Sequence, residues 1–188
     1  MPPPEEEDEE DNDGADKPSA AAEEADPRGR ALELGWFDDA YAIDCETFYS
    51  ARLRSSQPKE ARPEARAAHA ACWLANEAGG QMMVFGGRSA TGRLNDTWFL
   101  DVRSGLWSAV ATSGRTPSAR SFHSLTTVVT PAGHPLAMLF GGLGADGVHL
   151  ADLHVFCPTL RSWAFISASA APRPRGCAAV AAGSEKKL

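Results

Sequence analysis

The chain has 188 residues and a net charge of −7 at pH 7, but this charge is divided unevenly. Residues 1–26 carry 12 acidic residues and one lysine, whereas residues 27–188 carry 13 acidic and 17 basic residues. A nucleic-acid-binding protein is disfavoured, because the basic excess is small and no basic stripe with interleaved aromatic residues is present.

We expect residues 1–30 to form a disordered acidic tail. The first 26 residues contain no aromatic and no β-branched residue, so they cannot bury enough apolar surface to offset the entropy of ordering. Such a run of like charge is typical of a solvating tail, although it could also fold back onto basic loops of the same chain.

We expect no targeting segment. Its acidic start does not resemble a signal peptide, and no apolar run approaches the roughly 18 residues of a transmembrane helix. The four cysteines form neither a CxxC pair nor a zinc-type cluster, which indicates reduced thiols in a cytoplasmic or nuclear protein.

Short strands with turn signals between them predict an all-β, antiparallel fold over residues 31–183. A first half unit, at 38–54, contains two strands. A complete unit follows at 63–112, with strands that we name a, b, c and d: Arg66–Leu74, Gln81–Gly87, Asp96–Asp101 and Leu106–Ala111.

A second complete unit is predicted at 117–168. Its strands in the same order are Ser121–Val129, Leu136–Gly142, Asp152–Cys157 and Ser162–Ser167. Residues 172–182 begin a further unit with strand a alone, and 184–188 form a C-terminal tail.

The second unit contains Gly142-x-Gly144-x-x-Gly147, the spacing of a dinucleotide-binding loop. That loop requires a helix after the glycines and an acidic residue about 20 positions further on. Here the next residues alternate between apolar and polar, as in a strand, and position 167 is serine. We therefore expect no nucleotide cofactor.

The glycines belong instead to an internal repeat. "MMVFGG" recurs as "AMLFGG" 55 residues later, and "NDTWFLDVRSGLW" recurs as "ADLHVFCPTLRSW" after 56. "PEARAAH" recurs as "PSARSFH" and then, more weakly, as "PRPRGCA". The recurring landmarks are Arg66, Gly86, Gly87, Trp98, Trp107, Arg120, Gly141, Gly142, Trp163 and Arg175.

These landmarks have structural interpretations. Trp107 and Trp163 would supply apolar area between neighbouring sheets, and each Gly-Gly pair would permit close backbone approach and positive φ. The recurring arginines would cap a turn or pair with an acidic group of a neighbouring sheet. The recurring His69 and His123 are likewise interpreted as structural rather than catalytic.

The pattern resembles the kelch repeat: an FGG doublet, a variable loop, an Asp-led strand and a Trp about a dozen residues on. The resemblance implies a β-propeller of four-stranded antiparallel blades. Two positions depart from the pattern, because His154 stands where Trp98 is expected and Cys157 stands where Asp101 is expected.

The number of units predicts an incomplete ring. Propellers close with about four to eight blades, whereas this sequence holds two complete units, a half unit and a single strand. We expect a fragment of a larger propeller with poor stability alone, or a piece that associates with another propeller piece.

The resemblance implies a protein-interaction module. In such a meander the b–c and d–a loops share one face, here presenting Arg88, Ser89, Thr91, Arg93, Asn95, Asp146 and His149, with Ser113, Arg115 and Thr116. Arginines beside Ser and Asn suit a carboxylate or phosphate, so we predict binding of a partner protein's acidic peptide. That these are merely solvated loop residues remains the alternative.

We expect no enzyme activity, metal or cofactor in this chain. No GxSxG occurs, no histidine lies at ligand spacing from another, and the two tyrosines occupy repeat positions. The alternative is a fragment of a larger protein whose catalysis lies outside this chain, as in a phosphatase, a ubiquitin-ligase adaptor or a metal oxidase.

Overall fold

The described part of the chain begins with a small β-hairpin. A computed structural model describes residues 36–76, 79–167 and 173–178, which all lie within the compact unit Trp36–Leu188. Strands β1 (Tyr41–Ile43) and β2 (Ser50–Arg52) pair antiparallel in the predicted half unit. A 3-10 turn, η1 (Lys59–Ala61), follows and was not predicted.

The first complete unit forms a four-stranded antiparallel sheet, which we call blade 1. Its strands are β3 (Ala70–Leu74), β4 (Gln81–Ser89), β5 (Gly92–Asp101) and β6 (Leu106–Ala109), in the spatial order β3-β4-β5-β6. The predicted a-b-c-d meander is therefore confirmed for this unit.

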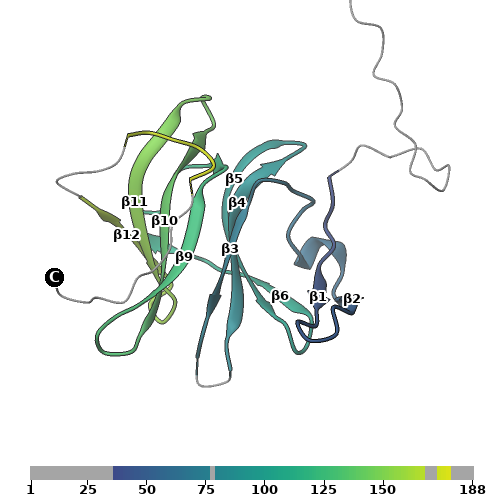
Figure 1. Cartoon of the computed structure of the whole chain (residues 1–188). Coiled ribbons are helices and arrows are strands. Elements are labelled where there is room, and N and C mark those ends of the chain that lie inside the picture. The colour runs from purple at the N-terminus through teal and green to yellow at the C-terminus, as the bar shows by residue number, and fades with distance from the viewer. Residues whose placement is uncertain (1–35, 77–78, 168–172, 179–188) are drawn as a thin grey trace, which may run out of the picture. The chain divides into compact units, whose positions relative to one another are not determined.

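The second unit, blade 2, repeats this arrangement beside blade 1 (Figure 1). Its strands are β8 (Arg120–Ser121), β9 (Ser124–Val129), β10 (Pro135–Gly144), β11 (His149–Cys157) and β12 (Ser162–Ile166). Both β8 and β9 pair with β10, and β11 lies between β10 and β12. An unpredicted short strand, β7 (Ser113–Gly114), pairs parallel with β12.

Strands b and c are longer than predicted. In blade 1 strand b continues to Ser89 and strand c already begins at Gly92, so the expected variable loop is a tight hairpin turn. The Gly-Gly doublets do not end their strands. Because glycine tolerates positive φ, the backbone bends there and then resumes pairing up to the turn.

Strand a, by contrast, is interrupted. Ala68, Phe122 and Cys177 have φ values of 52°, 57° and 55°, and they recur at the same place in successive units. The Phe122 N–H donates to the Ala68 carbonyl at 2.9 Å, and the Cys177 N–H donates to the Phe122 carbonyl at 2.8 Å. These left-handed residues therefore link each unit to the next through the backbone.

The Gly-Gly doublets meet the neighbouring unit, as expected. A Cβ atom on Gly86 would lie 2.9 Å from the Arg120 carbonyl oxygen, and one on Gly141 would lie 2.8 Å from that of Arg175. Both glycines also have positive φ, near 60°. A side chain at either position would therefore be both strained and blocked by backbone.

The hydrophobic core lies between the two blades. It combines Leu74, Met83, Phe85, Phe99 and Val110 with residues of blade 2: Ala137, Leu139, Phe156 and Trp163. The Trp163 ring packs against the Phe85 ring with centroids 5.0 Å apart, which confirms that this tryptophan supplies contact area between blades. The Thr127 hydroxyl also donates to the Trp73 carbonyl across the same interface.

His123 is a buried titratable group in this interface. Its ring packs edge-on against Phe85 at 5.5 Å, and neither ring nitrogen has a hydrogen-bond partner in the described structure. Burial, together with the nearby Arg120 charge, lowers the pKa of His123 from 6.5 to about 4. The native state therefore holds a neutral imidazole.

The free energy of unfolding should fall as the pH is lowered from about 6.5 to about 4. Over this range the unfolded chain binds a proton at His123 that the folded chain does not, so acid favours unfolding by about 3 kcal/mol in total. Urea denaturation at several pH values would measure the slope. His123→Gln should make the free energy of unfolding depend less on pH, whereas His134→Gln, at an exposed position, should not. The same pH dependence in the wild type and in both variants would show that His123 does not cause it.

Two expectations fall largely outside the described residues. The acidic tail, 1–30, is not described, and of the last strand a only Gly176–Ala178 is described, without strand structure. Over the described ranges no helix is long and apolar enough to cross a membrane. All four cysteines are free.

Candidate functional site

The recurring arginines form buried clamps within each blade. The Arg66 guanidinium binds both carboxylate oxygens of Asp96, at 2.6 and 2.8 Å, and donates to the Gly86 carbonyl at 3.0 Å. A β-bulge opposite Gly86, where β5 has one extra residue, places Asp96 for this contact. The expectation that such arginines pair with a neighbouring blade is therefore wrong, since Asp96 belongs to the same blade.

Arg120 and Asp152 repeat this clamp in blade 2. Both Nη–carboxylate distances are 2.7 Å, and a third bond reaches the Gly141 carbonyl at 2.9 Å. Burial alone would raise the pKa of Asp152, but Arg120 and His154 hold it well below its usual range. The bidentate pair thus fixes β8 against the bulge of β11.

His154 takes over the role of the tryptophan that it replaces. In blade 1 the Trp98 indole N–H donates to the Asp96 carboxylate at 2.6 Å. In blade 2 the His154 Nε2 lies 2.9 Å from the Asp152 carboxylate, and its Nδ1 lies 3.2 Å from the Arg115 carbonyl. The departure from the repeat pattern therefore keeps the hydrogen bond to the clamp aspartate.

Arg175 carries only the first half of a clamp. Its Nε donates to the carbonyl two residues earlier, at 3.0 Å, as Arg66 and Arg120 also do. No carboxylate pairs with it among the described residues, and the residue is exposed. The geometry thus assigns the recurring arginines to blade structure, with Arg175 as an unpaired third copy.

The candidate binding residues lie mainly where the β4–β5 and β10–β11 hairpins turn, an end of the blades that we call the hairpin-turn surface. Arg88 and Arg93 are directly opposite each other across β4 and β5. Their side chains therefore leave the same face of the sheet, with Cβ atoms about 5 Å apart. The Arg93 Nε donates to the Ser121 hydroxyl at 2.9 Å, which leaves its terminal nitrogens free of a carboxylate in the described chain.

The polar neighbours of this arginine pair differ in availability. Ser89 is only 2% exposed, and its hydroxyl lies 2.9 Å from the Thr91 hydroxyl, so it stabilises the turn. Asn95 is exposed in the β-bulge of β5. The surface that a ligand could reach therefore consists of Arg88, Thr91, Arg93 and Asn95.

Asp146 and His149 occupy the matching turn of blade 2. The Asp146 carboxylate accepts a hydrogen bond from the Val148 N–H at 3.0 Å and so shapes the turn. His149 is exposed on β11, and its ring lies beside Gly176, where an added Cβ would be 3.5 Å away. His149 is the blade 2 counterpart of Arg93, since each pairs with the residue that directly follows the Gly-Gly doublet of strand b.

The d–a loop residues lie beside the outer strand of blade 2. Ser113 belongs to β7, which pairs with β12, and the Thr116 hydroxyl lies 3.3 Å from that of Thr112. The Arg115 guanidinium packs over the Phe165 ring, 4.8 Å from its centroid. The structure shows no direct contact between Arg115 and the Arg88–Arg93 pair.

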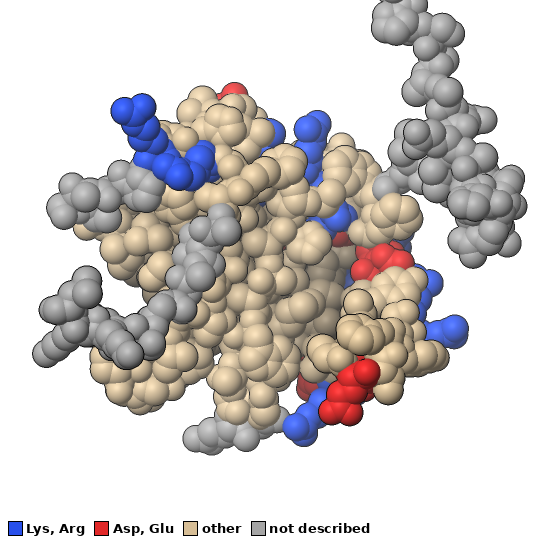
Figure 2. Space-filling model, viewed as in Figure 1, with Lys and Arg blue, Asp and Glu red and all other residues tan. Residues whose placement is uncertain are grey.

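The charge on this end of the blades is mainly positive. Basic side chains stand out at the end of the blades where the two hairpins turn, and little acidic surface is visible there (Figure 2). The part of the chain that the structure describes contains no group of three or more His, Cys, Asp or Glu side chains that could hold a metal ion. The arrangement can therefore offer hydrogen bonds and positive charge to an anionic group.

A pocket of about 540 Å³ lies beside the blade 1 clamp and was not foreseen from the sequence. It is lined by Trp36, Lys59, Glu60, Arg62, Glu64, Ala65, Arg66, Ala90, Asp96 and Trp98. Its charged lining is mixed, with three basic and three acidic residues. Segments far apart in the sequence form it, so only the packing of η1 and the first residues against blade 1 reveals it.

Comparison with known proteins identifies the repeat. The model of the KLHDC2/KLHL20/DRC7 Kelch-repeats domain matches residues 29–188. Kelch domain-containing protein 2 of Bos taurus is 32% identical over 142 residues, which cover 75% of this chain and 32% of the relative. Kelch domain-containing protein 1 of Mus musculus is 30% identical over 157 residues, which cover 82% and 36%.

A longer relative, which is named for a different activity, also matches. The tRNA wybutosine-synthesizing protein 4 of Aspergillus fumigatus is 31% identical over 130 residues, which cover 68% of this chain but 11% of the relative. The chain spans about a third of the length of the two Kelch domain-containing proteins.

Proposed function

This chain belongs to the KLHDC2/KLHL20/DRC7 kelch-repeat family, and from that membership we propose a non-catalytic protein-interaction module. Kelch domains generally mediate protein binding. The ligand that suits this chain best is an acidic peptide of a partner protein, bound at the hairpin-turn surface in a cytoplasmic or nuclear setting. Catalysis, where a protein of this family has it, would then belong to other parts of the molecule.

The observation that supports the acidic peptide most directly is the Arg88–Arg93 pair. Two arginines directly opposite each other on one sheet face repel each other, unless an anion lies between them. The hydrogen bond from Arg93 to Ser121 also restrains one guanidinium, so less side-chain entropy is lost on binding a carboxylate. Asn95 and Thr91 can add neutral hydrogen bonds from the same turn.

Replacing Arg88 and Arg93 together by alanine should weaken acidic-peptide binding at least about 10-fold, because two charge-assisted contacts are lost. Peptides selected from a random 12-residue library would serve as probes, measured by fluorescence anisotropy at two salt concentrations. The selected peptides should carry excess Asp and Glu, and their affinity should fall with salt.

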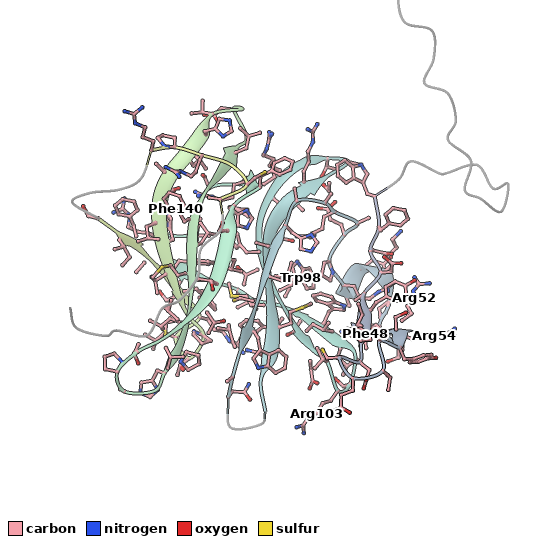
Figure 3. All side chains as sticks on the ribbon, in the orientation of Figure 1. Phe48, Arg52, Arg54, Trp98, Arg103 and Phe140 are labelled. Carbon is pink, nitrogen blue, oxygen red and sulfur yellow. The ribbon has the colours of Figure 1, made fainter. Side chains whose placement is uncertain are left out.

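A matched control is available elsewhere on the chain. Arg54 and Arg103 are exposed at the opposite end of blade 1 and the adjoining segment, and their replacement should leave affinity within about twofold (Figure 3). Arg115→Ala separates the contribution of the d–a loop. Equal affinity for the wild type and the Arg88→Ala/Arg93→Ala variant would refute the proposed surface.

A second candidate function rests on the enzyme-named relative. A match to 11% of a tRNA wybutosine-synthesizing protein shows that similar repeats accompany a different activity in a longer protein. Under this alternative the chain is a propeller segment of a multidomain protein whose catalytic part lies outside it. The coding sequence on either side of this chain would test the alternative directly.

A further inference from the structure

Strand β6 is the outer strand of blade 1, and one side chain bonds to its outward edge. The Trp107 N–H donates to the Gln57 Oε1 at 2.5 Å, and the Gln57 Nε2 donates to the Trp107 carbonyl at 2.8 Å. Two residues that face each other in an antiparallel sheet can exchange the same pair of bonds through their peptide groups. The Gln57 side-chain amide therefore takes the place of a strand residue beside β6.

In blade 2 a short backbone strand covers the matching edge, since β7 pairs parallel with β12. The Ser113 N–H donates to the Arg161 carbonyl at 3.0 Å. The Arg115 N–H donates to the Trp163 carbonyl at 2.9 Å. The approach is so close that a Cβ atom on Gly114 would lie 2.2 Å from the Trp163 carbonyl oxygen. The outer strand of blade 2 is thus covered by the backbone of the preceding loop.

The segment that carries Gln57 occupies the corresponding place beside β6. A Cβ atom on Gly105, in the turn before β6, would lie 3.1 Å from the Arg54 carbonyl oxygen. Gly105 and Arg161 both have positive φ, and each stands two residues before the recurring tryptophan. Residues 54–57 therefore lie along β6 as β7 lies along β12, but here the bonds to the tryptophan backbone come from a side chain.

The four residues of β6 carry none of the usual features that protect an edge strand. Their sequence, Leu-Trp-Ser-Ala, contains neither a charged residue nor proline, and their register with β5 is continuous. Because the Val110 N–H donates to the Thr97 carbonyl of β5, the alternation of the ladder turns the backbone groups of Trp107 and Ala109 outward. Gln57 bonds to the first of these two residues, so its release would open the whole edge of β6.

Ser55 holds Gln57 in this position, and we call these two side chains the edge cover. The Ser55 hydroxyl donates to the Gln57 Oε1 at 3.2 Å and accepts a bond from the Gln57 N–H, also at 3.2 Å. Both residues are half-buried and lie outside the helices and strands. Because the edge cover consists of local side-chain bonds rather than a packed strand, it can open without unfolding blade 1.

We propose that the edge cover controls self-association: while it is closed β6 is protected, and when it opens β6 pairs antiparallel with β6 of a second copy of this chain. The outward donors and acceptors of a strand are complementary to themselves when two copies meet about a two-fold axis. The side chains of β6 bring no charge to such a pair, and Leu106, 42% exposed, adds apolar contact area. A second copy therefore fits this edge without repulsion.

Hydrogen exchange of the Trp107 amide, measured on dilute protein in which the copies stay apart, tests the edge cover directly. Gln57→Ala removes the acceptor of this N–H, so the Trp107 amide should exchange at least about 10-fold faster than in the wild type. Ser56→Ala, at the adjacent exposed serine, is the matched control and should change the rate less than about twofold. The Val110 amide, which is bonded within blade 1, should be unaffected in both variants. An unchanged Trp107 rate in Gln57→Ala, or equal acceleration at Val110, would overturn the proposal.

Sedimentation velocity over a range of concentrations tests the pairing with a second copy. Gln57→Ala should tighten self-association at least about 10-fold relative to the wild type, because the edge of β6 is open. Adding Ala109→Pro should reverse this gain, since proline removes an outward N–H without breaking a bond to β5. Ala109→Lys keeps the backbone, places a charge beside the edge and should act in the same way. Self-association of Gln57→Ala equal to that of the wild type, or unaltered by both changes at Ala109, would overturn the pairing through β6.

Discussion

Replacing Arg120 by alanine should lower the free energy of unfolding by about 3–5 kcal/mol. The Arg120 side chain is fully buried, and its loss leaves the Asp152 carboxylate, whose side chain is 27% exposed, without the cation that binds both its oxygens. The Gly141 carbonyl and the Ser118 carbonyl also lose their donor. Urea denaturation followed by far-UV circular dichroism at pH 7 would measure the difference.

Arg175 provides a control with the same local backbone contact. Its Nε also donates to the carbonyl two residues earlier, but its guanidinium is exposed and has no carboxylate partner in the described chain. Arg175→Ala should therefore change stability by less than about 0.5 kcal/mol. Arg120→Lys should fall between the two, because lysine keeps the charge and loses the planar bidentate geometry. Equal losses for Arg120→Ala and Arg175→Ala would show that the clamp does not stabilise blade 2.

The internal repeat made most of the fold predictable. Because the landmarks recur in the same order, each strand of one unit predicts a counterpart in the other. The Gly-Gly doublets were correctly interpreted as points of close approach, since only glycine combines positive φ with the absence of a side chain. Pairing of Leu139 with His154 and of Phe140 with Leu153 confirms the central prediction of adjacent strands b and c.

The partner of each recurring arginine could not be read from periodicity. Arg66 and Asp96 recur with the same period, so spacing alone fits a contact within a blade as well as one between blades. The β-bulge opposite the first glycine decides the matter, because it turns the aspartate towards the start of its own blade. Bulges depend on tertiary pairing and leave little local signal.

The same limit applies to the candidate binding surface. The sequence predicts Arg88, Arg93 and His149 as loop residues, yet they lie in strands that extend beyond the predicted ends. The residue types are sufficient to suggest an anion site. The pairing of Arg88 with Arg93 could not be predicted from the sequence, because the register across a hairpin depends on the length and type of its turn.

His154 shows how a sequence pattern can fail while the interaction persists. By residue type, a histidine in place of the tryptophan departs from the repeat. Both the Trp98 indole and the His154 imidazole present a ring nitrogen to the clamp aspartate two residues earlier. In both blades this position therefore places a ring nitrogen at the aspartate, which a comparison by aromatic character overlooks.

Truncating Trp163 to alanine should also destabilise the fold by about 3–5 kcal/mol. The residue is 2% exposed and packs against Phe85 of blade 1 and Phe156 of its own blade, with ring centroids 5.0 and 5.1 Å away. Its removal leaves a cavity at the centre of the interface between blades, where the neighbouring backbone is held by the glycine contacts. Urea denaturation followed by circular dichroism would again measure the loss.

Two further variants distinguish ring contact from hydrogen bonding. The Trp163 indole N–H has no acceptor in the described structure, so Trp163→Phe removes an unsatisfied donor while keeping an aromatic ring. Trp163→Phe should therefore lower the free energy of unfolding by about 1–2 kcal/mol, well below the effect of Trp163→Ala. Trp107→Ala should also cost less than Trp163→Ala, because Trp107 is half-buried and lines an open pocket of about 240 Å³. Equal effects of alanine at the two tryptophans would mean that the buried ring contacts of Trp163 stabilise the protein no more than the half-buried Trp107 does.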